Sequence, residues 1–117
     1  MSLEVQIHEG EAHLLIKAVG QYSLANFQEL FDRVKKASEN RANPRVILDV
    51  SEVAGTIPVL DMMVLGEHCA RFWKQSFKVA IVSPVGGLTK FFENVAQNRG
   101  VQVAVVPHQG AAMQWLR

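Results

Sequence analysis

The sequence contains a single cysteine, Cys69, among 117 residues. One cysteine cannot form a disulfide within the chain, which excludes disulfide-stapled secreted scaffolds and favours a reducing compartment. The basic start and apolar block of a signal peptide are missing, and no apolar run is long enough to span a bilayer. We therefore expect a cytoplasmic protein with no integral membrane segment.

Neither sign of charge is in excess. Twelve Lys and Arg residues oppose eleven Asp and Glu residues, for a formal net charge of +1, so nothing in the composition points to nucleic acid or to an anionic membrane. Hydrophobic residues make up 49% and charged residues 20% of the chain, as is typical of a globular protein rather than a disordered one. The length suits one domain, residues 1–117, with its own core.

Groups that carry catalysis or bind metals are scarce. The four histidines show no metal-ligand spacing, and no second cysteine accompanies Cys69, so we expect no metal site. Asp61 and His68 lie two turns apart on a predicted helix, which is too far for a direct hydrogen bond. Because no third group completes a triad, we expect no catalytic residues, no cofactor and no enzyme activity.

Two further stretches have a functional and a structural interpretation. Residues 83–88, SPVGGL, lie between a predicted strand and a predicted helix, where glycines would let backbone N–H groups hold an anion. The lysine and the spacing of a P-loop are absent, and turn chemistry alone explains the proline and glycines. Asn98, Arg99 and Gly100 are explained in the same way as a helix end.

The spacing of the hydrophobic residues predicts alternating strands and helices. Two segments with period-2 alternation flank Glu9-Gly10-Glu11 and predict an antiparallel hairpin. Three nearly continuous apolar runs predict central strands that are covered on both faces. The strands are expected at 3–8, 12–19, 46–50, 79–82 and 101–106, and the helices at 24–36, 57–73, 88–99 and 111–116. This order predicts an α/β domain in which one mixed five-stranded sheet carries about four helices, with right-handed parallel crossovers after the hairpin.

Local signals fix some ends of these helices. Ser23 and Thr56 carry side-chain oxygens that are suited to helix N-caps, and Gly100 suits the left-handed position after a helix. On the third helix, Leu88, Phe91, Phe92 and Val95 are expected to face inward.

Several segments resemble a known family. LDMMVLGEHCARFW, KFFENVAQNRGVQVAVV and AAMQWL are similar to a bacterial STAS/SEC14-like family of the SpoIIAA-like superfamily, and VILDVSEVAGTIPVLDMMVLGE resembles the strand–loop–helix of STAS domains. The resemblance covers essentially the whole chain and implies the SpoIIAA-like fold. Relatives usually have acidic residues before the last helix, where this chain has His108, Gln109 and Gly110, so we expect that helix to be weakly capped.

The resemblance departs at the position of the family's switch. In antagonist-type STAS domains, a partner kinase phosphorylates a serine at the start of the second helix, which adds a charge of roughly −1.5 to −2. The corresponding positions here hold Ile57, Pro58 and Val59, none of which can be phosphorylated. Thr56 is the nearest hydroxyl, and its expected capping role explains it without a switch.

Two classes of function remain. The resemblance implies a non-enzymatic protein-interaction or regulatory module. The SEC14-like relationship implies instead a carrier or sensor of a small apolar, lipid-like ligand, with Met62, Met63, Phe72 and Trp73 lining a pocket. Core packing is the stronger explanation of these four side chains, because aromatic and Met side chains at helical spacing usually belong to the core.

A helical projection of residues 60–74 predicts a contact surface. The inward side holds Leu65, Cys69, Met62, Trp73, Gly66 and Met63. Glu67 and Arg71 lie on the outward side as an i,i+4 pair of opposite charge. Leu60 and Val64 lie among these charges, and two adjacent exposed apolar residues indicate a surface for a homodimer or a protein partner. The predicted surface comprises Thr56, Pro58, Leu60, Val64, Glu67 and Arg71. The alternative is that a neighbouring loop covers Leu60 and Val64.

Overall fold

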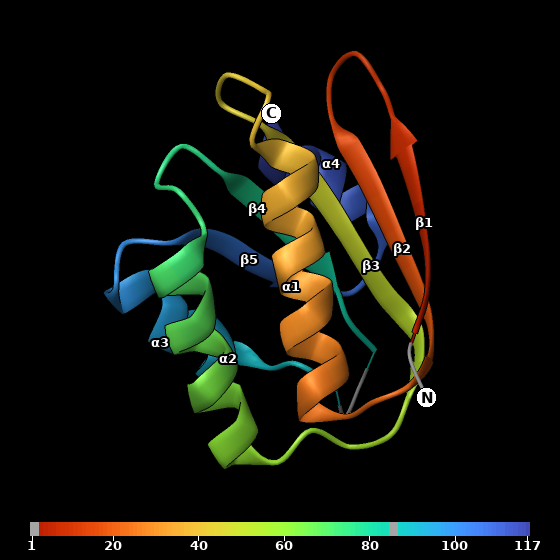
Figure 1. The fold of residues 1–117 in the computed structure, drawn as a ribbon, viewed down its shortest axis with the longest axis vertical. Coiled ribbons are helices and arrows are strands. Elements are labelled where there is room, and N and C mark those ends of the chain that lie inside the picture. Colours follow the sequence, from red (N-terminus) through yellow and green to blue (C-terminus); the bar gives the residue numbers. More distant parts are fainter. Residues whose placement is uncertain (1–2, 85–86) are drawn as a thin grey trace.

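Five strands form one mixed sheet with the order β1-β2-β3-β4-β5 (Figure 1). The hairpin of β1 (Glu4–Glu9) and β2 (Leu14–Gln21) is antiparallel, and β3 (Arg45–Ala54), β4 (Lys78–Val82) and β5 (Gln102–Val106) each pair in parallel with the preceding strand. The predicted mixed α/β sheet with an N-terminal hairpin is therefore confirmed.

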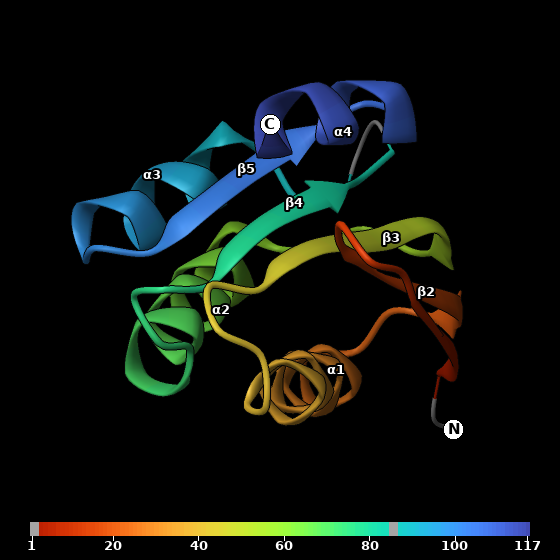
Figure 2. The same cartoon turned by 90° about the horizontal axis from the view of Figure 1, so that it is seen from above.

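The computed structural model describes residues 3–84 and 87–117. Helices α1 (Leu24–Ser38) and α2 (Val59–Phe72) cover one face of the sheet, α3 (Lys90–Asn98) packs beside α2 next to β5, and α4 (Gln109–Leu116) covers the opposite face (Figure 2). Val85 and Gly86, the centre of the SPVGGL stretch, lie outside the described residues. In the part of the chain that the structure describes, no helix has the length and apolar character needed to cross a membrane.

Two hydrophobic clusters hold these layers together. The larger lies between the sheet and α1, α2 and α3, and its aromatic centre is Phe31, which packs against Trp73 and Phe92 at ring-centroid distances of 5.1 and 6.0 Å. The Trp73 indole N–H also donates to the Phe31 carbonyl oxygen at 2.9 Å. The smaller cluster holds Ile47 against α4.

Side chains of α3 occupy the outer edge of β5. The Glu93 carboxylate is buried and accepts a hydrogen bond from the Val105 N–H at 2.7 Å, and the Gln97 amide donates to the Val103 carbonyl at 2.8 Å. These bonds satisfy backbone groups that an edge strand otherwise leaves open to pairing with another chain.

Several predicted helix ends need correction. Ser23 caps α1 as expected by accepting from the Asn26 N–H, whereas the N-cap of α2 is Pro58, so Thr56 is not a cap. The last helix is capped by His108, whose Nδ1 accepts from the Ala111 N–H at 3.0 Å, so it is not weakly capped. Helix α3 is capped by Thr89 and begins at residue 90, later than expected.

Two residues predicted to face inward are exposed. Met63 is 42% and Phe91 is 38% exposed. Met63 lies on α2 and Phe91 on α3. Hydrophobic spacing shows which residues share a side of a helix, but not how much of that side the neighbouring elements cover.

Candidate interaction site at helix α2

The start of α2 is held in place by the junction between β2 and α1. Gly55 takes a positive φ of 112° in the turn after β3, and Ile57 is buried beneath the chain. The Tyr22 N–H donates to the Ala54 carbonyl at 2.8 Å, and the Tyr22 hydroxyl donates to the Asp61 carboxylate at 2.8 Å. Burial and the hydrogen bond to Asp61 raise the pKa of Tyr22.

The outward side of this helix start is apolar. Leu60 is 74%, Val59 59% and Val64 39% exposed, and with Met63 they form a surface that we call the α2 apolar face. No loop among the described residues covers Leu60 and Val64, so the alternative interpretation of these two residues is wrong for this part of the chain. Whether this face binds a partner stays a prediction.

The inward side of α2 packs closely against the sheet and α3. Cys69 is fully buried, and burial raises the pKa of its thiol well above the ordinary value, which makes it an inert core residue. An added Cβ atom at Gly66 would lie only 2.6 Å from Cγ1 of Val95. The absence of a side chain at Gly66 therefore lets α2 and α3 approach each other.

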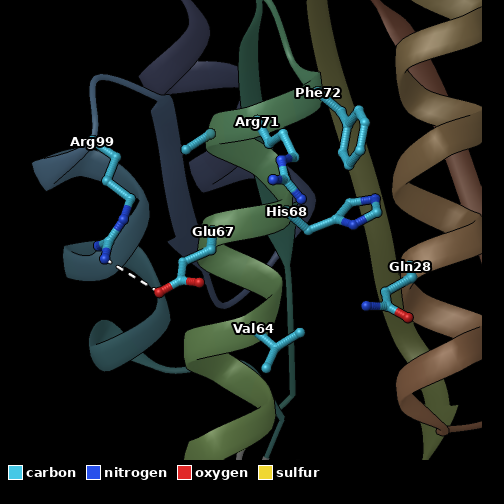
Figure 3. Close-up of a pocket in the computed structure, with 8 residues that line it drawn as sticks. Gln28, Val64, Glu67, His68, Arg71, Phe72 and Arg99 are labelled. Carbon is cyan, nitrogen blue, oxygen red and sulfur yellow. Dashed lines mark hydrogen bonds and ion pairs between the residues drawn. The ribbon is translucent and has the colours of Figure 1, made fainter.

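Beyond the α2 apolar face, the surface is hollowed by a depression of about 520 Å³, which we call the α2 groove (Figure 3). It is lined by Gln28, Val64, Glu67, His68, Ala70, Arg71, Phe72 and Arg99. Residues of α2 form most of the lining, with Gln28 contributed by α1 and Arg99 by the end of α3.

Charged groups of the α2 groove pair differently from the sequence prediction. Glu67 binds Arg99, with 3.3 Å between Oε1 and Nη2, rather than its i,i+4 neighbour Arg71. The Arg71 guanidinium instead lies 6.0 Å from the centroid of the Phe72 ring. The expected Glu67–Arg71 pair is therefore wrong.

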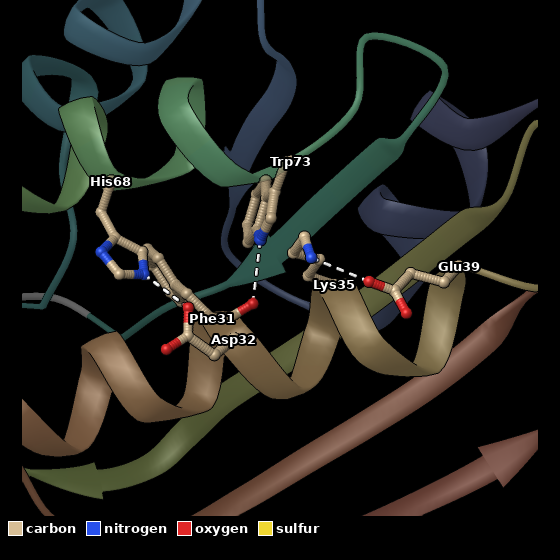
Figure 4. Close-up of polar contacts among 6 residues, drawn as sticks. All are labelled: Phe31, Asp32, Lys35, Glu39, His68 and Trp73. Atoms are coloured by element: carbon tan, nitrogen blue, oxygen red, sulfur yellow. Dashed lines mark hydrogen bonds and ion pairs between the residues drawn. The ribbon is translucent and has the colours of Figure 1, made fainter.

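His68 connects α2 to α1 beside this groove. Its Nε2 lies 2.8 Å from Oδ1 of Asp32 (Figure 4). The centroid of its ring lies 4.7 Å from that of Phe72. The sequence suggested only Asp61 as a hydrogen-bond partner for His68, but Asp61 accepts from Tyr22 instead. The true partner of His68 is 36 residues away along the chain, and no local pattern identifies it.

The side chains proposed to line an apolar ligand pocket lie in two different environments. Met62 and Trp73 are buried in the core, whereas Met63 and Phe72 are exposed. Of the predicted surface residues, Thr56 and Pro58 are exposed in the segment that leads into the α2 apolar face.

Asp49 is the buried carboxylate at the centre of the sheet. Oδ1 accepts from both the N–H and the hydroxyl of Ser51, at 2.9 and 2.6 Å, and Oδ2 accepts from the Gln109 amide at 2.7 Å. Burial alone would raise the pKa of Asp49, but these hydrogen bonds outweigh it and lower the pKa. Asp49 thus tethers α4 to β3.

Within residues 3–84 and 87–117, no three His, Cys, Asp or Glu side chains are grouped so as to hold a metal ion.

Comparisons with known proteins place this geometry in a fold. No family model matches the chain, and no curated protein matches it. One similar solved structure is that of an uncharacterised DUF3478-family protein with a SpoIIAA-like fold from Shewanella loihica PV-4. The two sequences are 20% identical, the TM-score is 0.56, and the match covers 99% of this chain and 94% of the other. An anti-sigma factor antagonist from Mycobacterium paratuberculosis is 12% identical with a TM-score of 0.59, and covers 98% and 94% respectively. The chain therefore has the SpoIIAA-like fold that its resemblance to STAS domains predicted.

Proposed function

We propose that this domain is a non-enzymatic interaction module that binds a protein partner through the α2 apolar face. The observation that carries the proposal is the uneven distribution of exposed apolar side chains. Among the described residues, nine large hydrophobic side chains are exposed, and five of them belong to α2. Scattered exposed apolar residues need no explanation, whereas a cluster of this kind marks a contact site.

The position of the face in the fold supports the same conclusion. Helix α2 begins after the carboxyl end of β3, and the crevice beyond the carboxyl ends of parallel strands is where α/β sheets usually bind their ligands. One structural neighbour is an anti-sigma factor antagonist, a protein whose name implies that it acts on another protein.

The expected partner is a different protein that binds transiently. A stable dimer buries about 800 Å² on each subunit, and four partly exposed side chains supply only a fraction of that area. A second copy of this chain on this face would need contacts well beyond Val59, Leu60, Met63 and Val64.

The carrier alternative has less support from the packing. A carrier of an apolar molecule needs an apolar cavity that encloses most of its ligand. The residues beneath α2, including Met62, Leu65 and Trp73, are packed into the main core, and the α2 groove lies on the outer surface with several charged groups.

We also propose that partner binding is not switched by phosphorylation at the start of α2. Ile57, Pro58 and Val59 offer no hydroxyl to a kinase. Thr56 is exposed and is not a cap, and it carries the nearest hydroxyl. A constitutive apolar face would instead make binding depend on the concentration of the partner. Phosphothreonine at Thr56 together with altered partner binding would contradict this proposal.

The test is a Leu60→Glu, Val64→Lys double variant. Exposed substitutions usually change stability by less than about 0.5 kcal/mol, so the circular dichroism spectrum and Tm should match those of the parent. Capture of the partner in a pull-down should be lost. The matched control is Val19→Glu with Met113→Lys, since these residues are similarly exposed but lie away from α2, and it should bind like the parent.

Two results would contradict the proposal. Unchanged capture by the α2 double variant would place the interface elsewhere. Collapse of its fold would show that Leu60 and Val64 contribute to the core.

A further inference from the structure

We infer that the α2 groove is a binding site for a small organic anion, in which a carboxylate or phosphate is joined to a flat apolar group. Arg71 would bind the anion, and the rings of Phe72 and His68 would contact the apolar part. This inference goes beyond partner binding and does not depend on it.

The first step is that Arg71 lacks an acidic partner among the described residues. An arginine four residues after a glutamate on a helix normally pairs with it. Here Arg99, at the C-terminal end of α3, binds Glu67 at 3.3 Å and draws that carboxylate toward α3 (Figure 3). Asp32 of α1, which contacts the groove residue His68, is bound to it at 2.8 Å. The Arg71 guanidinium therefore stays available to an external anion.

The second step is that the neighbouring rings are held in position. Asp32 anchors His68 from α1, and the His68 side chain is only 14% exposed. Phe72 packs against His68, with 4.7 Å between the ring centroids, and lies beneath the Arg71 guanidinium. A ring that is already held in position loses little conformational entropy when its free surface contacts a ligand.

The third step is the size and chemistry of the site. The volume of about 520 Å³ lies within the range of roughly 300–1,000 Å³ that is typical of small-molecule sites. A planar guanidinium binds carboxylate and phosphate through two parallel hydrogen bonds. The exposed Phe72 ring favours a flat apolar group beside that anion. Together these features select the class of ligand.

The experiment is an NMR titration of the ¹⁵N-labelled full chain with benzoate, phenyl phosphate and the neutral analogue benzamide. The two anions should cause saturable shifts of the amide signals of residues 64–72, and benzamide should not. Arg71→Gln should weaken binding about tenfold or more, because a charged hydrogen-bonding partner is lost. The control Arg45→Gln removes an exposed arginine on the α4 side of the sheet and should leave the Kd unchanged.

A second pair of variants tests why Arg71 is available. Arg99→Gln should weaken anion binding, because the released Glu67 can pair with Arg71. Adding Glu67→Gln to Arg99→Gln should restore the parent's Kd, since the competing carboxylate is then gone.

Three results would overturn the inference. The first is the absence of saturable shifts with both anions, and the second is equal binding of benzamide. The third is a double variant that binds as weakly as Arg99→Gln alone, which would assign the anion to Arg99 instead of Arg71.

Discussion

At the scale of single residues, Tyr22 illustrates how one side chain positions the site. It lies at the end of β2, yet its hydroxyl binds Asp61 in the first turn of α2. A hydrogen bond to a carboxylate is worth about 1.5–3 kcal/mol, enough to matter for the placement of the α2 apolar face. The bond requires a protonated phenol, because the phenol hydroxyl is its donor.

Tyr22 is the only tyrosine in the chain, so the absorbance of phenolate at 295 nm reports its ionisation alone. Burial and Asp61 raise its pKa, and in the folded protein this absorbance should therefore stay low as pH rises past about 10, the ordinary pKa of tyrosine. Because the folded-state pKa is raised, the stabilisation is fully present below pH 10 and is lost as pH rises further toward the folded pKa.

The matched variant is Tyr22→Phe, which should lose about 1–3 kcal/mol of stability at neutral pH. Its stability should also fall less steeply than that of the parent in alkaline solution. A parent phenol that titrates near pH 10 in the folded state would show that the bond to Asp61 is not maintained in solution.

Residue-level predictions from local chemistry succeeded at Ser23 and failed at Thr56, because α2 begins only at Val59, after Pro58. Ser23 was assigned correctly as a cap because its hydrogen-bond partner is three residues away. The Glu67 pairing failed because Arg99, 32 residues later, competes with Arg71 for the same carboxylate. Sequence spacing along one helix carries no information about a cation on another helix.

At the scale of elements, the close contact between α2 and α3 determines which side of α2 remains exposed. Gly66 lies against Val95 and Ala96 of α3, and this contact covers one flank of α2 while Met63 remains outside it. A helical projection shows which residues share a side, but not which sides are covered by neighbouring helices. That is why Met63 was assigned to the wrong side.

This contact makes a prediction about Gly66→Ala. Alanine favours a helix over glycine by about 1 kcal/mol, so an unconstrained site would be stabilised. Here the new Cβ atom would lie 2.6 Å from Cγ1 of Val95, and overpacking of this kind costs about 1–3 kcal/mol. We expect a net loss of stability in urea unfolding.

The control for this prediction adds Val95→Ala, which removes the atom that clashes. The double variant should be more stable than the sum of the two single effects implies. A Gly66→Ala variant that is more stable than the parent would show that α2 and α3 are less closely packed than described.

At the scale of the whole molecule, the sequence predicted the architecture well. The alternation of strands and helices limits the topology to a parallel sheet with right-handed crossovers, and a hairpin adds one antiparallel strand. The apolar runs of the predicted central strands place Val46, Ile47, Leu48, Val79, Ile81, Val103 and Val105 in the core. All of them are fully buried except Val105, which is partly buried and packs against the core. The α2 groove was not predicted, because its lining comes from three helices that only the folded chain brings together.

The central claim is that the α2 apolar face binds a protein partner, and site-specific photocrosslinking tests it most directly. Leu60 is replaced by a photoreactive benzophenone amino acid in cells that naturally make the protein, and Val19, which is also exposed, is replaced in a control. We predict one discrete covalent adduct from position 60 that disappears when Val64→Lys is added, and no such adduct from position 19. Equal crosslinking from both positions, or an adduct that survives Val64→Lys, would contradict the claim.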